Sequence, residues 1–249
     1  MTSLFICDID ECLAVPFEPY DLDALTEMAR VTRTAAIDDR PAVSLMSGRA
    51  FPYVEAMSQL LGCVAPVLFE SGGGLFNRVA GRVTWHPAFT PDVEAQIAEV
   101  AAWIKRDLIP STNLQFDYGK RTQAGVIGPD KDETARVADV VRTYQEQHYP
   151  DLVTFNTPIS VDVLCADITK REGIEWLADV TDIAPFHMAF IGDSNGDLGA
   201  IAAVGMGCAP ANAVPGVQEA ADFVSPSSCA RGVLEAYQAF CAREADLRG

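Results

Sequence analysis

Three carboxylates follow a short apolar segment at the start of the chain. The segment SLFIC spans residues 3–7, and Asp8, Asp10 and Glu11 come directly after it. Carboxylates this close repel one another and resist ionising together unless a positive charge lies among them. Strand ends are also where open α/β sheets bind their ligands. The stretch therefore indicates a metal site or an active site, although a solvated turn after a strand would give the same pattern.

Polar residues follow an apolar run at three further places in the sequence. If the apolar runs are strands of one parallel sheet, their ends meet at the same edge, so all four places should converge on one crevice. The further places are Ser47-Gly48-Arg49 after AVSLM (42–46), Lys170 at the start of a predicted helix after VDVLC (161–165), and GDSNGD (192–197) after MAFI (188–191).

Together these residue types fit phosphoryl transfer. A carboxylate such as Asp8 can attack phosphorus and form an aspartyl-phosphate. Asp10 can protonate the leaving oxygen and later take a proton from water. Oxygen ligands from Asp8 and Asp193 suit Mg²⁺, which would neutralise the clustered acids and the phosphate together. Lys170 supplies a point charge for the phosphoryl group, and Ser47 can donate a hydrogen bond to another of its oxygens.

The elements needed to position these residues are a parallel sheet and the helices that cover it. Fully apolar runs of strand length alternate with amphipathic stretches through most of the chain. This alternation predicts an α/β fold with a Rossmann-like parallel sheet as its core. In the middle, a helix–strand–strand pattern occurs twice and breaks the rhythm. We therefore predict a core formed by residues 1–82 and 160–249, with a small α+β cap domain inserted at residues 83–159.

The inserted module has its own candidates for contact with a substrate. A predicted hairpin around Gly119 carries Tyr118, Lys120 and Arg121, which could reach the crevice. A hairpin exposed to solvent explains the same residues equally well.

Composition restricts the possible partners. The chain has 249 residues and a formal net charge of -17, which argues against nucleic acid and anionic membrane surfaces as partners. No apolar run has the length of a membrane span and no secretory signal opens the sequence, so we expect a cytoplasmic protein. The seven cysteines are scattered without a CxxC pair, which indicates reduced thiols and argues against a zinc site.

The four polar segments, in their order, resemble the four motifs of the haloacid dehalogenase-like (HAD) phosphohydrolase superfamily. The insertion point and the turn ESGGG (70–74) resemble the branch with larger caps, which includes sucrose-phosphate, mannosyl-3-phosphoglycerate and phosphoglycolate phosphatases. The resemblance covers essentially the whole chain. The matching residues are Asp8 and Asp10 for the DxD motif, SGR (47–49) for the second motif, Lys170 for the third and GDSNGD (192–197) for the fourth.

The resemblance implies Mg²⁺-dependent hydrolysis of a small phosphorylated metabolite through an aspartyl-phosphate. Asp197 would support either the waters of the metal or Lys170, and Asp10 would offer its backbone carbonyl to the metal. The implied catalytic residues are Asp8, Asp10, Ser47 and Lys170; the implied substrate contacts are Ser47, Gly48, Arg49, Lys170 and Asn195; the implied metal residues are Asp8, Asp10, Asp193 and Asp197.

Two departures from the family pattern bear on the site. Glu11-Cys12 stands where the family usually has Gly-Thr, which adds a negative charge and removes a hydroxyl donor. Gly196 stands where close relatives often have Asn. The sequence leaves open a phosphomutase or phosphotransferase of the same superfamily, a non-catalytic protein that binds a phosphometabolite, and a phospho-switch. It also leaves open which metabolite is bound and whether the protein is a monomer or a homodimer.

Overall fold

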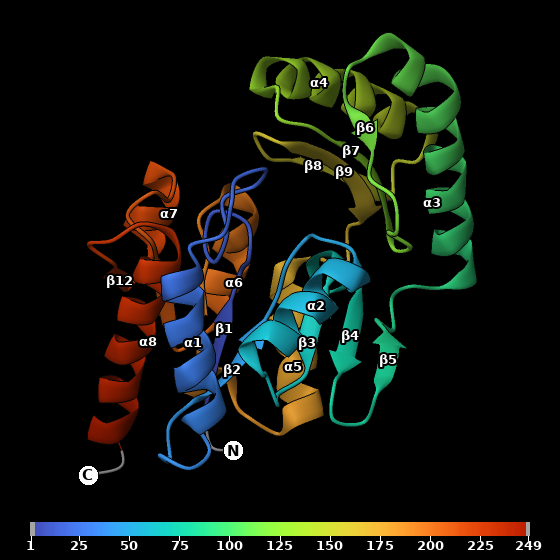
Figure 1. The fold of residues 1–249 in the computed structure, drawn as a ribbon. Helices are drawn as coiled ribbons and strands as arrows, with labels where there is room; N and C mark the ends of the chain where they lie inside the picture. Colours follow the sequence, from blue (N-terminus) through green and yellow to red (C-terminus); the bar gives the residue numbers. More distant parts are fainter. Residues whose placement is uncertain (1–2, 248–249) are drawn as a thin grey trace.

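The apolar runs at the two ends of the chain come together in one parallel sheet. The computed structural model describes residues 3–247, which form two lobes (Figure 1). The larger lobe contains a five-stranded sheet of order β12-β11-β10-β1-β2, and each neighbouring pair is parallel. The α/β fold with a parallel core sheet is therefore confirmed. Its strands are β1 (Leu4–Cys7), β2 (Ala42–Leu45), β10 (Met188–Ile191), β11 (Met206–Ala209) and β12 (Phe223–Val224).

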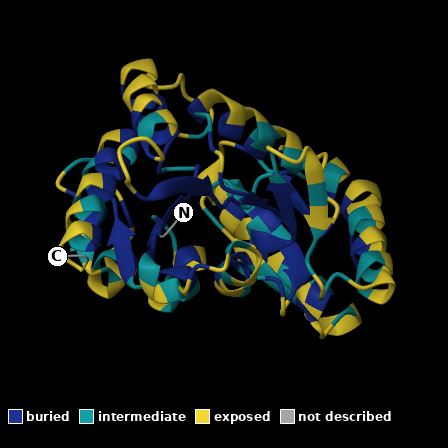
Figure 2. Ribbon diagram, turned by 90° about the horizontal axis from the view of Figure 1, so that it is seen from below, coloured by how far each residue is buried: buried dark blue, intermediate teal, exposed yellow. Residues whose placement is uncertain are grey.

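Helices cover both faces of this sheet, as fully apolar strands require. On β1, Phe5 and Cys7 belong to one buried cluster, whereas Leu4 and Ile6 belong to another on the opposite face. Figure 2 shows the buried strands inside and exposed residues on the outer surfaces of the helices. The helices of the first face are α1 (Leu22–Thr34), α2 (Phe51–Leu61) and α8 (Cys229–Asp246), and those of the second are α5 (Lys170–Thr181), α6 (Leu198–Ala203) and α7 (Pro215–Ala220).

A small antiparallel sheet extends the larger lobe beside β2. It consists of β3 (Val67–Phe69), β4 (Gly74–Asn77) and β5 (Arg82–Trp85) in that order. A parallel bridge between Met46 and Leu68 connects it to the end of β2. The apolar run PVLF (66–69) has the composition of a strand in the regular strand–helix alternation, but its ladder partner is the hairpin strand β4.

The smaller lobe is the inserted module, which we call the cap. Its antiparallel sheet has the order β6-β7-β9-β8, and two helices pack on one face of it. Side chains of Thr90 and Asp130 cap the first turns of these helices. The predicted double helix–strand–strand pattern is thus present. Its elements are α3 (Pro91–Trp103), β6 (Gln115–Phe116), β7 (Gln123–Ile127), α4 (Lys131–His148), β8 (Leu152–Asn156) and β9 (Ser160–Cys165).

One strand lies in a different sheet from the one that the sequence suggested. VDVLC was interpreted as a strand of the parallel core, but β9 pairs antiparallel with both β7 and β8 in the cap. An apolar run does not reveal its pairing partner, because that partner is distant in sequence. The division into a core of 1–82 and 160–249 and a cap of 83–159 stays a proposal. We propose to move its second boundary beyond Cys165, where β9 ends.

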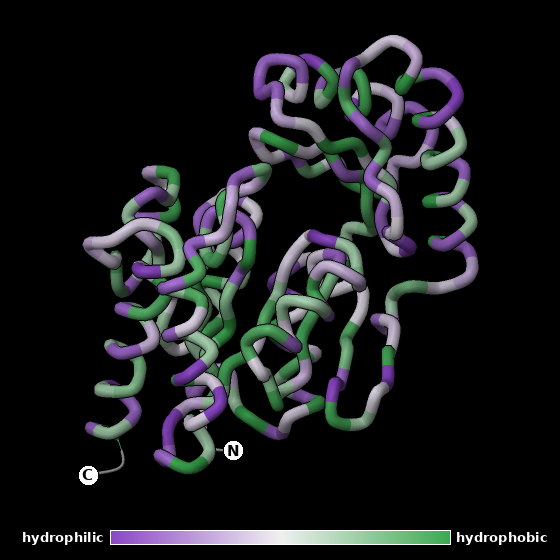
Figure 3. The backbone as a smooth tube through the Cα atoms, viewed as in Figure 1, coloured by the Kyte–Doolittle hydropathy of each residue, from purple (hydrophilic) through white to green (hydrophobic). Residues whose placement is uncertain are grey.

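The remaining helical turns are short. Within residues 3–247, no helix is both long and apolar enough to cross a membrane. Figure 3 shows hydrophobic residues concentrated in the strands, while hydrophilic residues recur along the two longest helices, α4 and α8. The short elements are a π turn at Ile104–Leu108 and 3-10 turns at Glu70–Gly72, Ile109–Ser111, Pro185–His187 and Asn195–Asp197.

Candidate active site

Three adjacent core strands deliver the predicted residues to one edge of the sheet. In the sheet register Cys7 lies beside both Leu45 and Ile191, so β1, β2 and β10 end level with one another. Asp8 continues the ladder by donating its backbone N–H to Ile191 O at 3.0 Å. The expected convergence of these strand ends is therefore present. A cavity of about 550 Å³ opens there between core and cap, lined by Asp8, Asp10, Ser47, Gly48, Arg49, Lys170, Asp193 and Asn195 among others.

Lys170 joins two of the carboxylates. Its Nζ donates to Asp8 Oδ2 at 2.6 Å and to Asp197 Oδ1 at 2.5 Å, and all three side chains are buried. Burial alone would lower the pKa of Lys170, but Asp197 and Asp8 outweigh it and raise the pKa above the ordinary value. Lys170 is therefore a fixed positive charge beside Asp8. It reaches this place from the first turn of α5, the helix start at which the sequence predicts it, although the preceding strand β9 belongs to the cap sheet and not to the core sheet.

Asp197 lies beneath the site and organises it. Its second oxygen, Oδ2, accepts hydrogen bonds from Ser194 Oγ at 2.8 Å, Ser194 N at 2.9 Å and Asp193 N at 3.2 Å. Both of its oxygens are thus already engaged, one by the loop after β10 and one by Lys170. Of the two roles that the resemblance offered for Asp197, these contacts favour support of Lys170.

The donor set fits a divalent cation. One carboxylate oxygen from each of Asp8, Asp193 and Asp197 lies within 4.8 Å of the others. Within the described part of the chain, the Asp193 side chain accepts no hydrogen bond. Burial raises the pKa of Asp193 to about 8, and repulsion by Asp8 and Asp197 adds to the shift. Burial likewise raises the pKa of Asp8 to about 7, although Lys170 opposes the shift. A hard cation bound by Asp8 and Asp193 would allow both carboxylates to be charged.

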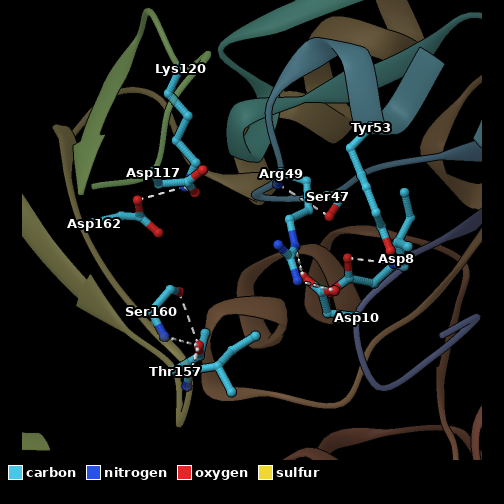
Figure 4. Close-up of polar contacts among 12 residues, drawn as sticks. Asp8, Asp10, Ser47, Arg49, Tyr53, Asp117, Lys120, Thr157, Ser160 and Asp162 are labelled. Carbon is cyan, nitrogen blue, oxygen red and sulfur yellow. Dashed lines mark hydrogen bonds and ion pairs between the residues drawn. The ribbon is translucent and has the colours of Figure 1, made fainter. Parts of the chain in front are cut away.

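Asp10 makes a two-point ion pair with Arg49. Arg49 Nε lies 2.6 Å from Asp10 Oδ2, and Nη2 lies 3.0 Å from Oδ1. The guanidinium also lies 5.1 Å from the centre of the Tyr53 ring. Arg49, predicted to contact the substrate, therefore orients the predicted acid/base residue in this structure. Figure 4 shows Asp8, Asp10, Ser47 and Arg49 together on the core side of the cavity.

Ser47 and Gly48 form the adjoining wall. Ser47 is fully buried, and its Oγ accepts a hydrogen bond from Arg49 N at 3.3 Å. Ser71, which the sequence analysis did not single out, also lines the cavity, and its N–H donates to Ser47 O at 2.9 Å. The Ser71 backbone is left-handed, with φ +57°. Its place in the glycine-rich turn ESGGG (70–74) was the only feature of the sequence that pointed to this residue. Asn195 is exposed and lies at the rim.

The two family departures have different structural consequences. Glu11 has φ +56°, a left-handed conformation that glycine adopts freely and that costs other residues roughly 1 kcal/mol. The loop is held by Asn212, whose Nδ2 donates to Glu11 O at 2.9 Å, and Glu11 also lines the cavity. Cys12 is fully buried among apolar residues of the core and does not line the cavity. Glu11 therefore changes the charge of the site, whereas Cys12 is a packing residue.

The cap hairpin contributes one of its three candidates to the cavity. Lys120 lines it, together with Asp117 and Asp162, which the sequence analysis missed. Tyr118 is 74% exposed and lies outside the lining. Arg121 also points elsewhere, because its guanidinium pairs with Glu94 at 2.8 Å on the surface.

Comparisons with known proteins agree with this arrangement. A family model described as haloacid dehalogenase-like hydrolase matches residues 111–236. A phosphoglycolate phosphatase of Archaeoglobus fulgidus is 37% identical over 88% of this chain and 93% of its own length. Another, from Natronomonas pharaonis, is 28% identical over 95% of this chain and 96% of its own length.

Solved structures show the same fold. A Thermoplasma acidophilum protein superimposes with a TM-score of 0.76 at 22% identity, covering 96% of this chain and 98% of its own. The sucrose-phosphatase of Synechocystis, solved with sucrose and phosphate, has a TM-score of 0.68 at 17% identity, again over 96% and 98% of the two chains. The matching family model and the phosphoglycolate phosphatase relatives agree with the strand-end carboxylates and the buried lysine of the site. The chain therefore belongs to the haloacid dehalogenase-like hydrolases and is a phosphatase.

Proposed function

We propose that the protein is a Mg²⁺-dependent phosphomonoester hydrolase that acts on a small phosphorylated metabolite. One observation carries the proposal: Lys170 bridges Asp8 and Asp197 at the strand ends, and a carboxylate oxygen of Asp193 lies within 4.8 Å of an oxygen of each. This arrangement offers a nucleophile, a positive charge for the phosphoryl oxygens and oxygen ligands for a cation in one place.

The proposed reaction has two displacements at phosphorus. A carboxylate oxygen of Asp8 attacks, the bond from phosphorus to the leaving oxygen breaks, and Asp10 gives that oxygen a proton. Water then attacks the aspartyl-phosphate, Asp10 takes a proton from it, and inorganic phosphate leaves with Asp8 restored. Bound Mg²⁺ would supply neutralisation of the phosphoryl charge. Arg49 orients Asp10, while Lys170 and Ser47 hold phosphoryl oxygens.

The relatives indicate where to look for the substrate. Phosphoglycolate phosphatases and a sucrose-phosphatase are among them, so phosphoglycolate and sugar phosphates are the first esters to test. A cytoplasmic location, the absence of nucleic-acid and membrane partners, and a monomeric or homodimeric state stay predictions from the sequence.

Phosphate release tests the proposal. We expect hydrolysis of para-nitrophenyl phosphate in MgCl₂, none with chelator, and a loss of roughly 10³-fold or more in Asp8→Asn. Asp151→Asn, an exposed carboxylate of the cap, is the matched control and should retain full activity. Release that persists in chelator or in Asp8→Asn would contradict the proposal. Transfer of phosphate to added sugars in preference to water would indicate a phosphotransferase instead.

A further inference from the structure

The cap wall of the cavity contains a second buried lysine between two carboxylates. Lys120 Nζ lies 2.6 Å from Asp162 Oδ1 and 2.9 Å from Asp117 Oδ2, and the lysine side chain is only 3% exposed. Asp162 and Asp117 outweigh the effect of burial and raise the pKa of Lys120, so the lysine is charged. Figure 4 shows the three side chains together, on the opposite side from the Asp10–Arg49 pair. We call these three residues the cap triad.

The cap sheet is built to present this triad to the cavity. Along β9, Val161 and Val163 pack under the cap helices, whereas Ser160 and Asp162 line the cavity. Gly125 lies directly opposite Asp162 in the neighbouring strand. A Cβ atom there would lie 2.2 Å from Asp162 Oδ1, so a glycine is what lets this carboxylate lie flat beside Lys120.

The triad has a formal net charge of −1, because one lysine pairs with two carboxylates. Burial raises the pKa of Asp162, and the ion pair with Lys120 opposes this shift. The cavity's other buried or half-buried cations are also engaged: Arg49 by Asp10, and Lys170 by Asp8 and Asp197. Lys131, the remaining lysine of the lining, lies at the exposed start of α4, where solvent screens its charge, and Glu11 adds a further negative charge to the lining.

Charge on the cap wall discriminates between kinds of leaving group. A carboxylate there would meet two fixed carboxylates and a lysine already shared between them, and like-charge juxtaposition is costly in a desolvated site. A hydroxyl group, by contrast, can donate to Asp162 and accept from Lys120 at the same time.

We propose that the cap triad is the leaving-group subsite of this phosphatase, and that it selects leaving groups bearing hydroxyls over those bearing a carboxylate. Lys120 and Asp162 would contact the leaving group, and Asp117 would position Lys120. The inference rests on the proposed function, since it assigns the part of the substrate that departs from phosphorus. It runs against phosphoglycolate as the preferred ester.

Two nearly isosteric esters test the proposal. Glycerol 3-phosphate and 3-phosphoglycerate differ only in having CH₂OH or a carboxylate at the far end. We expect the wild-type protein with MgCl₂ to show kcat/KM at least about tenfold higher for glycerol 3-phosphate. Asp162→Asn, which makes the triad neutral, should reduce this ratio by about fivefold or more, and Asp117→Asn should reduce it to a smaller extent. Lys105→Met, at an exposed cap lysine outside the cavity, should leave the ratio unchanged.

The outcomes separate this inference from the proposed function. Equal or reversed preference in the wild-type protein, or ratios that do not move in either Asp variant, would overturn the subsite. Failure to hydrolyse para-nitrophenyl phosphate would instead count against the phosphatase proposal. In that case, calorimetric binding of the two esters to Asp8→Asn protein with MgCl₂ still tests the subsite. We expect glycerol 3-phosphate to bind more tightly. Tighter binding of 3-phosphoglycerate would overturn the proposed subsite.

Discussion

Two buried lysines, each between two aspartates, line the same cavity, one from the core and one from the cap. Lys170 and Lys120 have side chains that are 9% and 3% exposed, and each makes both of its ion pairs within 2.9 Å. The difference lies in what is beside them. Asp193 adds a further carboxylate to the Lys170 cluster, at the ends of the core strands. A buried lysine between two aspartates can thus serve phosphoryl chemistry at the ends of the core strands and recognition of the leaving group on the cap wall.

The comparison also shows how differently the two units are assembled. Asp8, Lys170 and Asp197 come from three segments that only the core fold brings together. Asp117 is three residues from Lys120, and Asp162 is on a strand of the same small sheet. The two units share no residue, so a substitution in the cap triad removes none of the ion pairs of Lys170.

Loss of Lys170 should have the largest effect. Lys170→Gln leaves Asp8 and Asp197 buried without their cation, and it removes a donor to the phosphoryl group. We expect kcat to fall by roughly 10²–10³-fold for every ester, including para-nitrophenyl phosphate. Steady-state kinetics on the ester panel measures this loss, and Arg171→Gln, at the exposed neighbouring position, is the matched control. A loss confined to one leaving group would mean that Lys170 and Lys120 do not differ in role.

The dependence of stability on Mg²⁺ should distinguish the Lys170 cluster from the cap triad, because only the Lys170 cluster has Asp193 beside it. A buried carboxyl whose pKa is raised from 3.8 to about 8 disfavours its charged form in the folded protein. In the absence of metal, the contribution of Asp193 to the free energy of unfolding is therefore most favourable below pH 3.8, and it is lost as the pH rises through about 8. Mg²⁺ needs the charged form, so the increase in melting temperature on adding MgCl₂ should grow from pH 6 to pH 9.

Asp193→Asn provides the matching variant. In chelator at pH 8 we expect it to melt about 2–4 °C higher than the wild-type protein, because like-charge repulsion is removed. MgCl₂ should then stabilise the wild type and not the variant. Differential scanning fluorimetry measures both effects, and a variant that still responds to MgCl₂ would exclude Asp193 as a ligand.

The smallest expected effect concerns the contact that places the cap hairpin. Glu70 is fully buried after β3, and its Oε2 accepts from Thr122 N at 2.6 Å, Thr122 Oγ1 at 2.7 Å and Arg121 N at 2.9 Å. Glu70→Ala should cost about 1–3 kcal/mol of stability, since it leaves buried N–H groups unpaired. Lys120 is next in the chain to Arg121, so KM for glycerol 3-phosphate should rise severalfold more than KM for para-nitrophenyl phosphate. Equal changes in both would mean that the two units are not separately positioned.

The core of the site could be predicted because its signals are local. A carboxylate pair, a Ser-Gly pair and an acidic loop each follow an apolar run, and parallel strands bring such ends together. The sheet that contains β9, the strand before Lys170, could not be predicted, because an apolar run looks the same whether it pairs in the core or in the cap. Asp162 was missed for a related reason: an aspartate between valines resembles the solvent side of a strand until its partner Gly125 is known.

Contacts between distant residues were equally hidden. Nothing in SGR (47–49) indicates that Arg49 would pair with Asp10, which lies 39 positions earlier. The hairpin was recognised, but which of its side chains faces the cavity depends on how it packs. The structure places Lys120 inside, whereas Tyr118 and Arg121 are directed outward.

The strand β9 and the start of α5 form one continuous stretch, residues 160–170, in which Asp162 and Lys170 are eight positions apart. This stretch limits how such proteins can be recombined. A chimera that takes its cap from a relative by joining at residue 159 would keep the host's Asp162 beneath a foreign hairpin, and the imported residue at position 120 would meet the wrong partner. Joining between Cys165 and Lys170 would transplant the whole recognition unit and leave the phosphoryl machinery intact. Specificity in this scaffold is therefore exchangeable as a block, provided that the crossover falls within those four connecting residues.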